Sequence, residues 1–274
     1  MKRSEASLRV RWETLARVCT FLGLSLFLVL SSCSRRSEVD PAKVRSHVQH
    51  FLRESLDREG GREAVSRLSS YRAEGIITLI PERKVVRIVR IVDAAGRLRT
   101  EVRDGAQGDV RIISESGTWS GHDDRSLSFA ESSLLDVLAM TAAGREFPLP
   151  YADRPDLLDI EHPDKKKRPV LRARGPSGLL IDYHLDKKSR LAAISVRAEE
   201  EPDLVYRVEL KSFRRLDGAR FPFRESIYKD DEHLAEVRFR NVEIQPDLPA
   251  SLFVPRVEGG SPSDSTRPPA TASQ

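Results

Sequence analysis

The chain has 274 residues, a formal net charge of +4 and 32% charged residues. Residues 1–32 hold five of the basic residues but only two acidic ones, so the remainder is nearly neutral, with interspersed signs. Such a remainder lacks the broad positive field that binds nucleic acid, and no nucleic-acid partner is expected. The two cysteines, Cys19 and Cys33, exclude a network of internal disulfides, so core packing has to stabilise the fold.

Residues 1–32 have the pattern of a secretory signal peptide. A polar, net-positive segment at 1–17 precedes an uncharged, leucine-rich run at 18–30. As a helix that run spans about 20 Å, which is short of the ~30 Å hydrocarbon core of a bilayer. The sequence therefore favours export over a permanent transmembrane helix.

The residues Leu30-Ser31-Ser32-Cys33 resemble the lipobox of bacterial lipoproteins. The resemblance implies cleavage before Cys33 and acylation of its thiol, for example with palmitate. Two or three acyl chains form an essentially permanent membrane anchor, because each buried methylene contributes roughly 0.8 kcal/mol. Ser34, in place of aspartate, favours the outer membrane, facing the periplasm. The alternatives are an ordinary signal peptide followed by a chance cysteine, or an uncleaved N-terminal anchor.

A polar tether at residues 33–40 leads into the first predicted helix. Asp40 suits the N-cap and Pro41 the first helical position, and a Gly-Gly pair ends the helix after an apolar stripe of helical period. A second short helix is predicted at 62–69.

From residue 74 the pattern changes to short runs rich in valine and isoleucine, separated by turn signals. This spacing is typical of an antiparallel meander. The predicted strands are 74–80, 84–92, 98–102, 110–113, 117–121, 157–161, 170–174, 179–185, 191–197, 204–213, 221–228 and 234–244. One internal helix interrupts them, since Ser128 and Glu131 match a capping box and Gly144 a C-cap. Residues 259–274 have the composition of a disordered tail.

Short segments between residues 60 and 256 follow one another in a suggestive order. They are Gly60-Gly61-x-x-Ala64-x-x-x-Leu68, Tyr71-Arg72-Ala73-Glu74-Gly75, Leu98-x-x-Glu101, Gly117-x-Trp119, Asp217-Gly218-x-x-Phe221-Pro222, Phe239-x-Asn241-Val242-x-Ile244 and Leu252-Phe253-x-x-Pro255. In this order they resemble the LolA/LolB outer-membrane lipoprotein-sorting superfamily. The resemblance implies an α+β, mostly β fold for residues 41–258. Its sheet would be antiparallel and strongly curved, an unclosed half-barrel with helices packed on the concave side.

The same resemblance implies an apolar cavity that accepts acyl chains of lipids or lipoproteins. The protein would then act in cell-envelope lipid or lipoprotein trafficking, with the membrane and a periplasmic carrier protein as partners. The alternative is a non-catalytic envelope lipoprotein that uses the sheet as a protein-interaction or structural module, which a completely filled concave face would favour. The expected cavity-lining residues, with ordinary core packing as the competing interpretation, are Val86, Ile88, Val89, Trp119, Ile181, Tyr183, Val208 and Phe239.

No enzyme activity, metal or cofactor is expected. The chain has no G-x-S-x-G elbow, P-loop or dinucleotide-binding glycine fingerprint. His47 and His50 are three residues apart on the first helix but have no further ligands nearby in the sequence. The loop at His122 and Asp123 is interpreted as a polar turn, and a hydrolase built on these two residues is a third hypothesis. The basic run at 164–168 is interpreted as a solvated loop, with contact to anionic head groups as the alternative.

Overall fold

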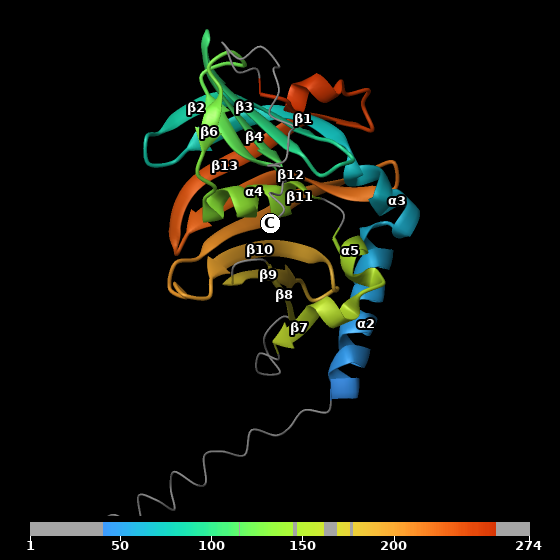
Figure 1. Ribbon diagram of the computed structural model, residues 1–274. Coiled ribbons are helices and arrows are strands. Elements are labelled where there is room, and N and C mark those ends of the chain that lie inside the picture. The colour runs from blue at the N-terminus through green and yellow to red at the C-terminus, as the bar shows by residue number, and fades with distance from the viewer. Residues whose placement is uncertain (1–40, 115, 145–146, 162–168, 176–177, 256–274) are drawn as a thin grey trace, which may run out of the picture. The chain divides into compact units, whose positions relative to one another are not determined.

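The computed structural model describes residues 41–114, 116–144, 147–161, 169–175 and 178–255. Contacts within the chain separate residues 1–44 from a compact unit that begins at Arg45. In the described part of that unit, thirteen strands form one antiparallel sheet that does not close on itself (Figure 1). The mostly β class and the open, curved sheet predicted from the sequence are confirmed.

The helices at the start of the described chain agree with the sequence prediction. They are α2 (Pro41–Glu59), α3 (Arg62–Ser66) and the 3₁₀ turn η1 (Arg67–Ser69). Val48 and Leu52, one helical turn apart on α2, are both buried. The helix ends at Gly60, whose φ of 125° and close approach to the Gly218 carbonyl leave no room for a side chain. Asp40, the predicted N-cap, lies outside the described residues.

Two meanders meet in the middle of the sheet. Strand order is β6-β5-β4-β3-β2-β1-β13-β12-β11-β10-β9-β8-β7, so every pair except β1 with β13 is consecutive along the chain. The strands are β1 (Tyr71–Leu79), β2 (Lys84–Val92), β3 (Leu98–Asp104), β4 (Gln107–Ser114), β5 (Gly117–Gly121), β6 (Ser128–Ala130), β7 (Leu158–Glu161), β8 (Val170–Arg174), β9 (Leu179–Leu185), β10 (Leu191–Ala198), β11 (Tyr206–Leu216), β12 (Ala219–Lys229) and β13 (Glu232–Ile244).

The internal helix α4 (Leu134–Ala143) begins later than predicted. Its capping box is Ser133 with Asp136, so the predicted pair of Ser128 and Glu131 is wrong. Ser128 instead belongs to β6, a three-residue strand that the sequence did not indicate, where it pairs with Ser120 of β5. The predicted end of α4 at Gly144 is confirmed.

Three short helical turns were not predicted. They are α5 (Leu149–Ala152), η2 (Pro155–Leu157) and η4 (Ala250–Phe253). No helix in the described ranges combines the length and apolar character needed to cross a membrane.

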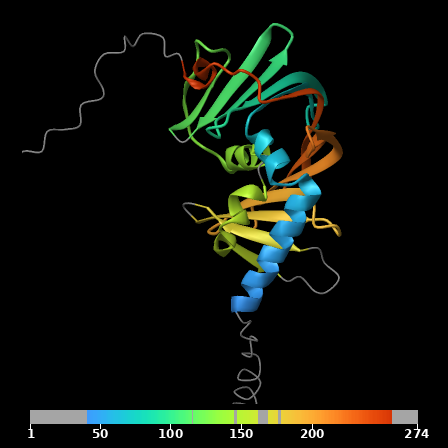
Figure 2. The ribbon, with the colours of Figure 1, turned by 90° about the vertical axis from the view of Figure 1, so that its right-hand side faces the viewer.

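The main core lies inside the curve of the sheet, where α4 runs between the two meanders (Figures 1 and 2). It joins Leu68 of η1, Ala143 of α4, Tyr71 of β1 and the rings of Phe221 and Phe239. Helices therefore cover the concave side, as the sequence resemblance implied. A second, smaller core of Ile91, Val110, Ile112, Leu127 and Phe253 lies on the opposite face of β2 to β4.

Candidate functional site

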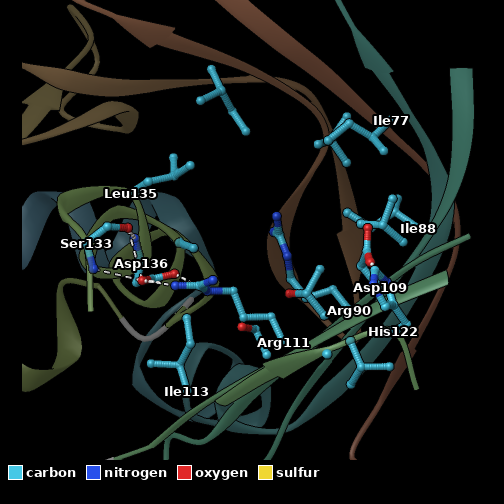
Figure 3. A pocket seen from close by; sticks show the side chains of 18 residues that line it. Ile77, Ile88, Arg90, Asp109, Arg111, Ile113, His122, Ser133, Leu135 and Asp136 are labelled. Atoms are coloured by element: carbon cyan, nitrogen blue, oxygen red, sulfur yellow. Dashed lines mark hydrogen bonds and ion pairs between the residues drawn. The ribbon is translucent and has the colours of Figure 1, made fainter. Parts of the chain in front are cut away.

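A pocket of about 690 Å³ lies between α4 and the concave face of the sheet (Figure 3). This volume falls within the range of roughly 300–1,000 Å³ that is usual for small-molecule sites. Most of its lining is aliphatic and comes from β1 to β4, β12, β13 and α4. The apolar lining residues that face the pocket include Ile77, Ile88, Val102, Ile113, Leu135, Ala139, Ile227 and Val237.

Helix α4 separates this pocket from a filled part of the core. Leu135 and Ala139, four residues apart, line the pocket, whereas Leu138 and Ala142, also four apart, are buried. Residues four apart share a face of a helix, so the two pairs point in different directions. The helix itself lies against β10 and β11.

An ion pair ties the start of α4 to β4 across the pocket. The Arg111 guanidinium donates two hydrogen bonds to the Asp136 carboxylate, at 2.6 and 2.5 Å. One oxygen of the same buried carboxylate accepts the backbone N–H of Ser133 at 2.8 Å. Asp136 therefore caps its own helix and fixes the position of that helix over the sheet.

A second ion pair is buried beside the pocket. Arg90 of β2, which lines the pocket, donates two hydrogen bonds of 2.8 Å to Glu225 of β12, and its guanidinium lies 4.9 Å from the centre of the Phe239 ring. Burial lowers the pKa of Arg90, but the charge of Glu225 and the hydrogen bonds that Arg90 makes with Glu225 and Tyr71 more than offset this, so the pKa is raised. The guanidinium therefore stays charged next to an apolar space.

This ion pair was not predicted from the sequence, although the alternation of residues along the strand contains a signal for it. In the predicted strand 84–92, Arg87 and Arg90 are an odd number of residues apart, and alternate residues of a strand face opposite sides. One of the two had to point inward. Likewise, Glu225 follows Phe221 and Phe223 at intervals of two, on the apolar side of its strand.

A second, more polar cavity of about 540 Å³ adjoins the pocket. The two share Val102, Asp109 and His122 as lining residues. His122 and Asp109, both exposed, are joined by a hydrogen bond of 2.9 Å. The cavity is also lined by Lys84, which forms an ion pair of 2.7 Å with Asp104.

The hydrolase hypothesis paired His122 with Asp123, but the structure shows His122 bonded to Asp109 instead. Asp123 accepts the backbone N–H groups of Arg125 and Ser126 at 2.9 and 2.8 Å, so its carboxylate caps its own loop. These bonds lower the pKa of Asp123. His47 and His50 are exposed on α2, and no group of three potential metal ligands occurs in the described part of the chain.

Four of the predicted lining residues, Val86, Ile88, Val89 and Trp119, lie in the half of the sheet that bounds the pocket, which we call the pocket half (strands β1 to β5). Ile88 lines the pocket, and Val86 lines the adjoining polar cavity. Phe239, on the neighbouring strand β13, is buried in the main core beneath Arg90.

Three others lie in strands β8 to β11, which we call the filled half. Tyr183 stacks on Phe147 with 4.3 Å between ring centres, and its hydroxyl lies 3.0 Å from that of Tyr151. Burial raises the pKa of Tyr183 well above its usual value. Val208 of β11 is buried and lies opposite Ile194 of β10 and Ile227 of β12. Ile181 is half-buried on β9. None of the three lines the pocket.

Val89 and Trp119 face away from the pocket and pack against the smaller core on the other side of the sheet. Val89 follows Ile88 directly, so the two side chains of this strand cannot share a face. Trp119 pairs with Ile112 and packs edge-on against Phe129 at 5.9 Å between ring centres.

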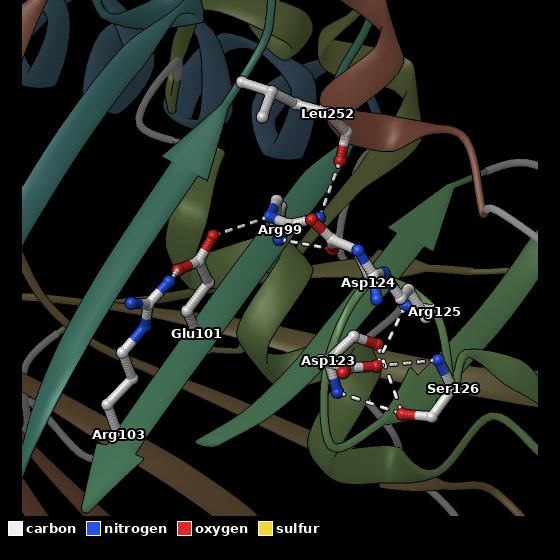
Figure 4. Close-up of polar contacts among 8 residues, drawn as sticks. All are labelled: Arg99, Glu101, Arg103, Asp123, Asp124, Arg125, Ser126 and Leu252. Atoms are coloured by element: carbon white, nitrogen blue, oxygen red, sulfur yellow. Dashed lines mark hydrogen bonds and ion pairs between the residues drawn. The ribbon is translucent and has the colours of Figure 1, made fainter. Parts of the chain in front are cut away.

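The segment at residues 248–253, which we call the C-terminal segment, covers this smaller core. Buried Arg99 holds it there (Figure 4). Its guanidinium donates to the Leu252 carbonyl at 3.0 Å, to Glu101 at 2.8 Å, and forms an ion pair with Asp124 at 2.6 Å. Arg103 donates to the other oxygen of Glu101 at 2.7 Å. The pocket half is thus covered on both faces.

Cys33, the predicted lipidation site, lies outside the described residues, as do the basic run at 164–168 and the tail at 259–274. Acylation of Cys33 therefore stays a prediction.

No protein-family model matches the chain, and no curated protein matches it in sequence. Solved structures to which it is similar include a LolA superfamily protein from Nitrosomonas europaea, at 12% identity and a TM-score of 0.49, covering 76% of this chain and 97% of that one. MucB is similar at 15% identity and a TM-score of 0.26, and its match spans 62% of the MucB chain. The complex of MucA and MucB from Pseudomonas aeruginosa gives 12% identity and a TM-score of 0.22. The similarity is one of architecture at low identity.

Proposed function

We propose that this protein binds an acyl chain of a lipid or lipoprotein in the pocket between α4 and the pocket half. The observation that carries the proposal is the open, largely aliphatic volume of about 690 Å³ inside an otherwise packed core. Each methylene that enters such a space contributes roughly 0.8 kcal/mol. The alternative, a sheet that serves only as a protein-interaction module, predicted a concave face filled by side chains, and the open pocket favours the first function.

The proposal includes a location in the cell envelope. The apolar run at 18–30 followed by Cys33 supports export and lipid anchoring, which would hold a lipid-binding cavity close to a bilayer. Changing Cys33→Ser tests the anchor: palmitate labelling and membrane association should both be lost. Labelling that persists in this variant contradicts acylation at Cys33.

A pocket-filling variant tests the binding site. Ala139→Trp places an indole from α4 into the pocket, whereas Ala94→Trp adds the same ring at an exposed turn between β2 and β3. A dansyl-labelled undecanoic acid, titrated against the full chain, should bind Ala139→Trp about tenfold more weakly than the wild type, the loss expected from displacing about two methylenes.

The Ala94→Trp variant should bind the probe like the wild type. The apolar run at 18–30 is present in the wild type and in both variants, so any probe binding to this run contributes equally to all three titrations. Equal affinity of the Ala139→Trp variant, with an unchanged unfolding midpoint, would overturn the proposed site.

A further inference from the structure

The cavity that adjoins the apolar pocket has a different chemistry. Its lining combines three aliphatic residues with Lys84, Gln107, His122 and carboxylates, and it meets the pocket at Val102, Asp109 and His122. A ligand whose hydrocarbon part lies in the pocket therefore has its polar end at the entrance to a second, polar compartment. Two joined compartments of this kind suit an amphiphile, with one chain and one headgroup.

Ion pairs cancel most of the charge around the two compartments. Arg90 is paired with Glu225, Arg111 with Asp136, and Lys84 with Asp104. The carboxylates that remain belong to Asp109, bonded to the His122 ring, and Asp123, bonded to its own loop backbone with Arg125 next to it. The polar cavity therefore contains two carboxylates, Asp109 and Asp123, whose hydrogen bonds come from an imidazole and from backbone N–H groups.

We infer that the bound amphiphile carries an amine in its headgroup, which the polar cavity receives beside Asp109 and Asp123. This inference rests on the proposed acyl-binding function and specifies the ligand class of the same site. A protonated amine gains favourable interactions with the two carboxylates, whereas a headgroup with only a phosphate gains none and is repelled. The aliphatic residues of the cavity accommodate the short carbon linker of such a headgroup.

Two lysophospholipids with the same lauroyl chain separate the effect of the amine. Lysophosphatidylethanolamine and lysophosphatidylglycerol share the chain and the phosphate, and only the first carries an amine. Each is used below its micelle concentration to displace the dansyl probe from the full chain. The ethanolamine lipid should compete at about fivefold lower concentration, the scale of an exposed ion pair, and raised salt should reduce the difference.

The double variant Asp109→Asn/Asp123→Asn should abolish the preference, so that the two lipids displace the probe at equal concentrations once each is referred to that variant's own probe affinity. Asparagine keeps an acceptor for the loop and for His122, so the fold is preserved. The matched control, Asp153→Asn/Asp156→Asn, removes the same charge from exposed residues paired with Arg62 and Arg154, and should keep the preference. Equal competition by the two lipids, or a preference unchanged in the first variant, overturns the inference alone. A probe that does not bind at all overturns the proposed function and this inference together.

Discussion

The two halves of the sheet use inward-facing side chains in opposite ways. In the filled half, Tyr183 and the buried residues around it meet a segment that follows α4 and contributes Phe147 and Tyr151. In the pocket half, the facing element is the side of α4 with Leu135 and Ala139, and none of the described residues that line the space is a phenylalanine, tyrosine or tryptophan. Side chains that point inward are thus buried in both halves, but a cavity remains only where the segment that covers them does not fill the space.

Charge also differs between the halves. The pocket half has a buried arginine, Arg90, whose only ion-pair partner in the described chain is Glu225. In the filled half, the buried carboxylate of Asp182 faces the side of the sheet opposite to Tyr183. It is shared by two cations, Arg172 at 2.6 Å and Arg197 at 3.0 Å. A carboxylate that is shared by two cations keeps one of them when the other is removed, so its loss of stability should be smaller.

The largest expected effect comes from breaking the pair in the pocket half. Arg90→Met removes the guanidinium that donates two hydrogen bonds to buried Glu225, which should lower the free energy of unfolding by about 3–5 kcal/mol. Arg172→Met should cost less, about 1–2 kcal/mol, because Asp182 keeps Arg197. Urea denaturation of the two variants measures both values.

The double variant Arg90→Met/Glu225→Met provides the control. It removes both charges and fills the site with apolar atoms, so most of the lost stability should return. If it is as unstable as Arg90→Met, the loss arises from packing around Arg90 and not from the carboxylate that has lost this guanidinium.

Matched isoleucines test whether one half is filled and the other open. Ile194 of β10 and Ile88 of β2 are both almost completely buried, but only Ile88 lines the pocket. Ile194→Ala should cost about 4 kcal/mol, since it creates a new cavity among packed side chains, and Ile88→Ala about 2 kcal/mol, since it removes fewer contacts beside an existing space. Equal losses in denaturation experiments would mean that the pocket is closed in solution.

Much of the fold was predictable because most of the strand pairing is local. Turn signals between consecutive strands set the hairpins, and Asp217-Gly218 is an example: both residues have positive φ, 46° and 89°, as a tight two-residue hairpin requires. The pairing of β1 with β13 joins the first and last strands in the middle of the sheet and has no local signal. β6, with three residues, is too short to produce a period in the sequence.

The candidate site was less predictable. Strand alternation could have assigned Val89 and Ile88 to opposite faces and identified Arg90 as a buried cation. Whether an inward residue such as Tyr183 lines a cavity depends on Phe147 and Tyr151, which are more than thirty residues away in sequence. No pattern within a strand contains that information.

The smallest effect concerns the outer face of the pocket half, which the segment around Leu252 and Phe253 covers. Glu101 receives hydrogen bonds from Arg99, which holds the Leu252 carbonyl, and from Arg103. Burial raises the pKa of Glu101, but the hydrogen bonds from the two arginines outweigh it, so the pKa is lowered. A carboxyl whose pKa is lower in the folded state stabilises that state above its unfolded pKa, and this contribution is lost as the pH falls through the folded pKa.

Glu101→Gln should therefore reduce the free energy of unfolding by about 1–2 kcal/mol at pH 7, the range for hydrogen bonds to a charged group. The difference from the wild type should shrink as the pH falls below about 4 and vanish once the wild-type carboxyl is protonated. Glu200→Gln, at an exposed position beyond β10, should match the wild type at every pH. A Glu101→Gln deficit that stays constant down to pH 3 would show that the carboxylate charge contributes nothing to holding the C-terminal segment, and that Arg99 positions Leu252 without it.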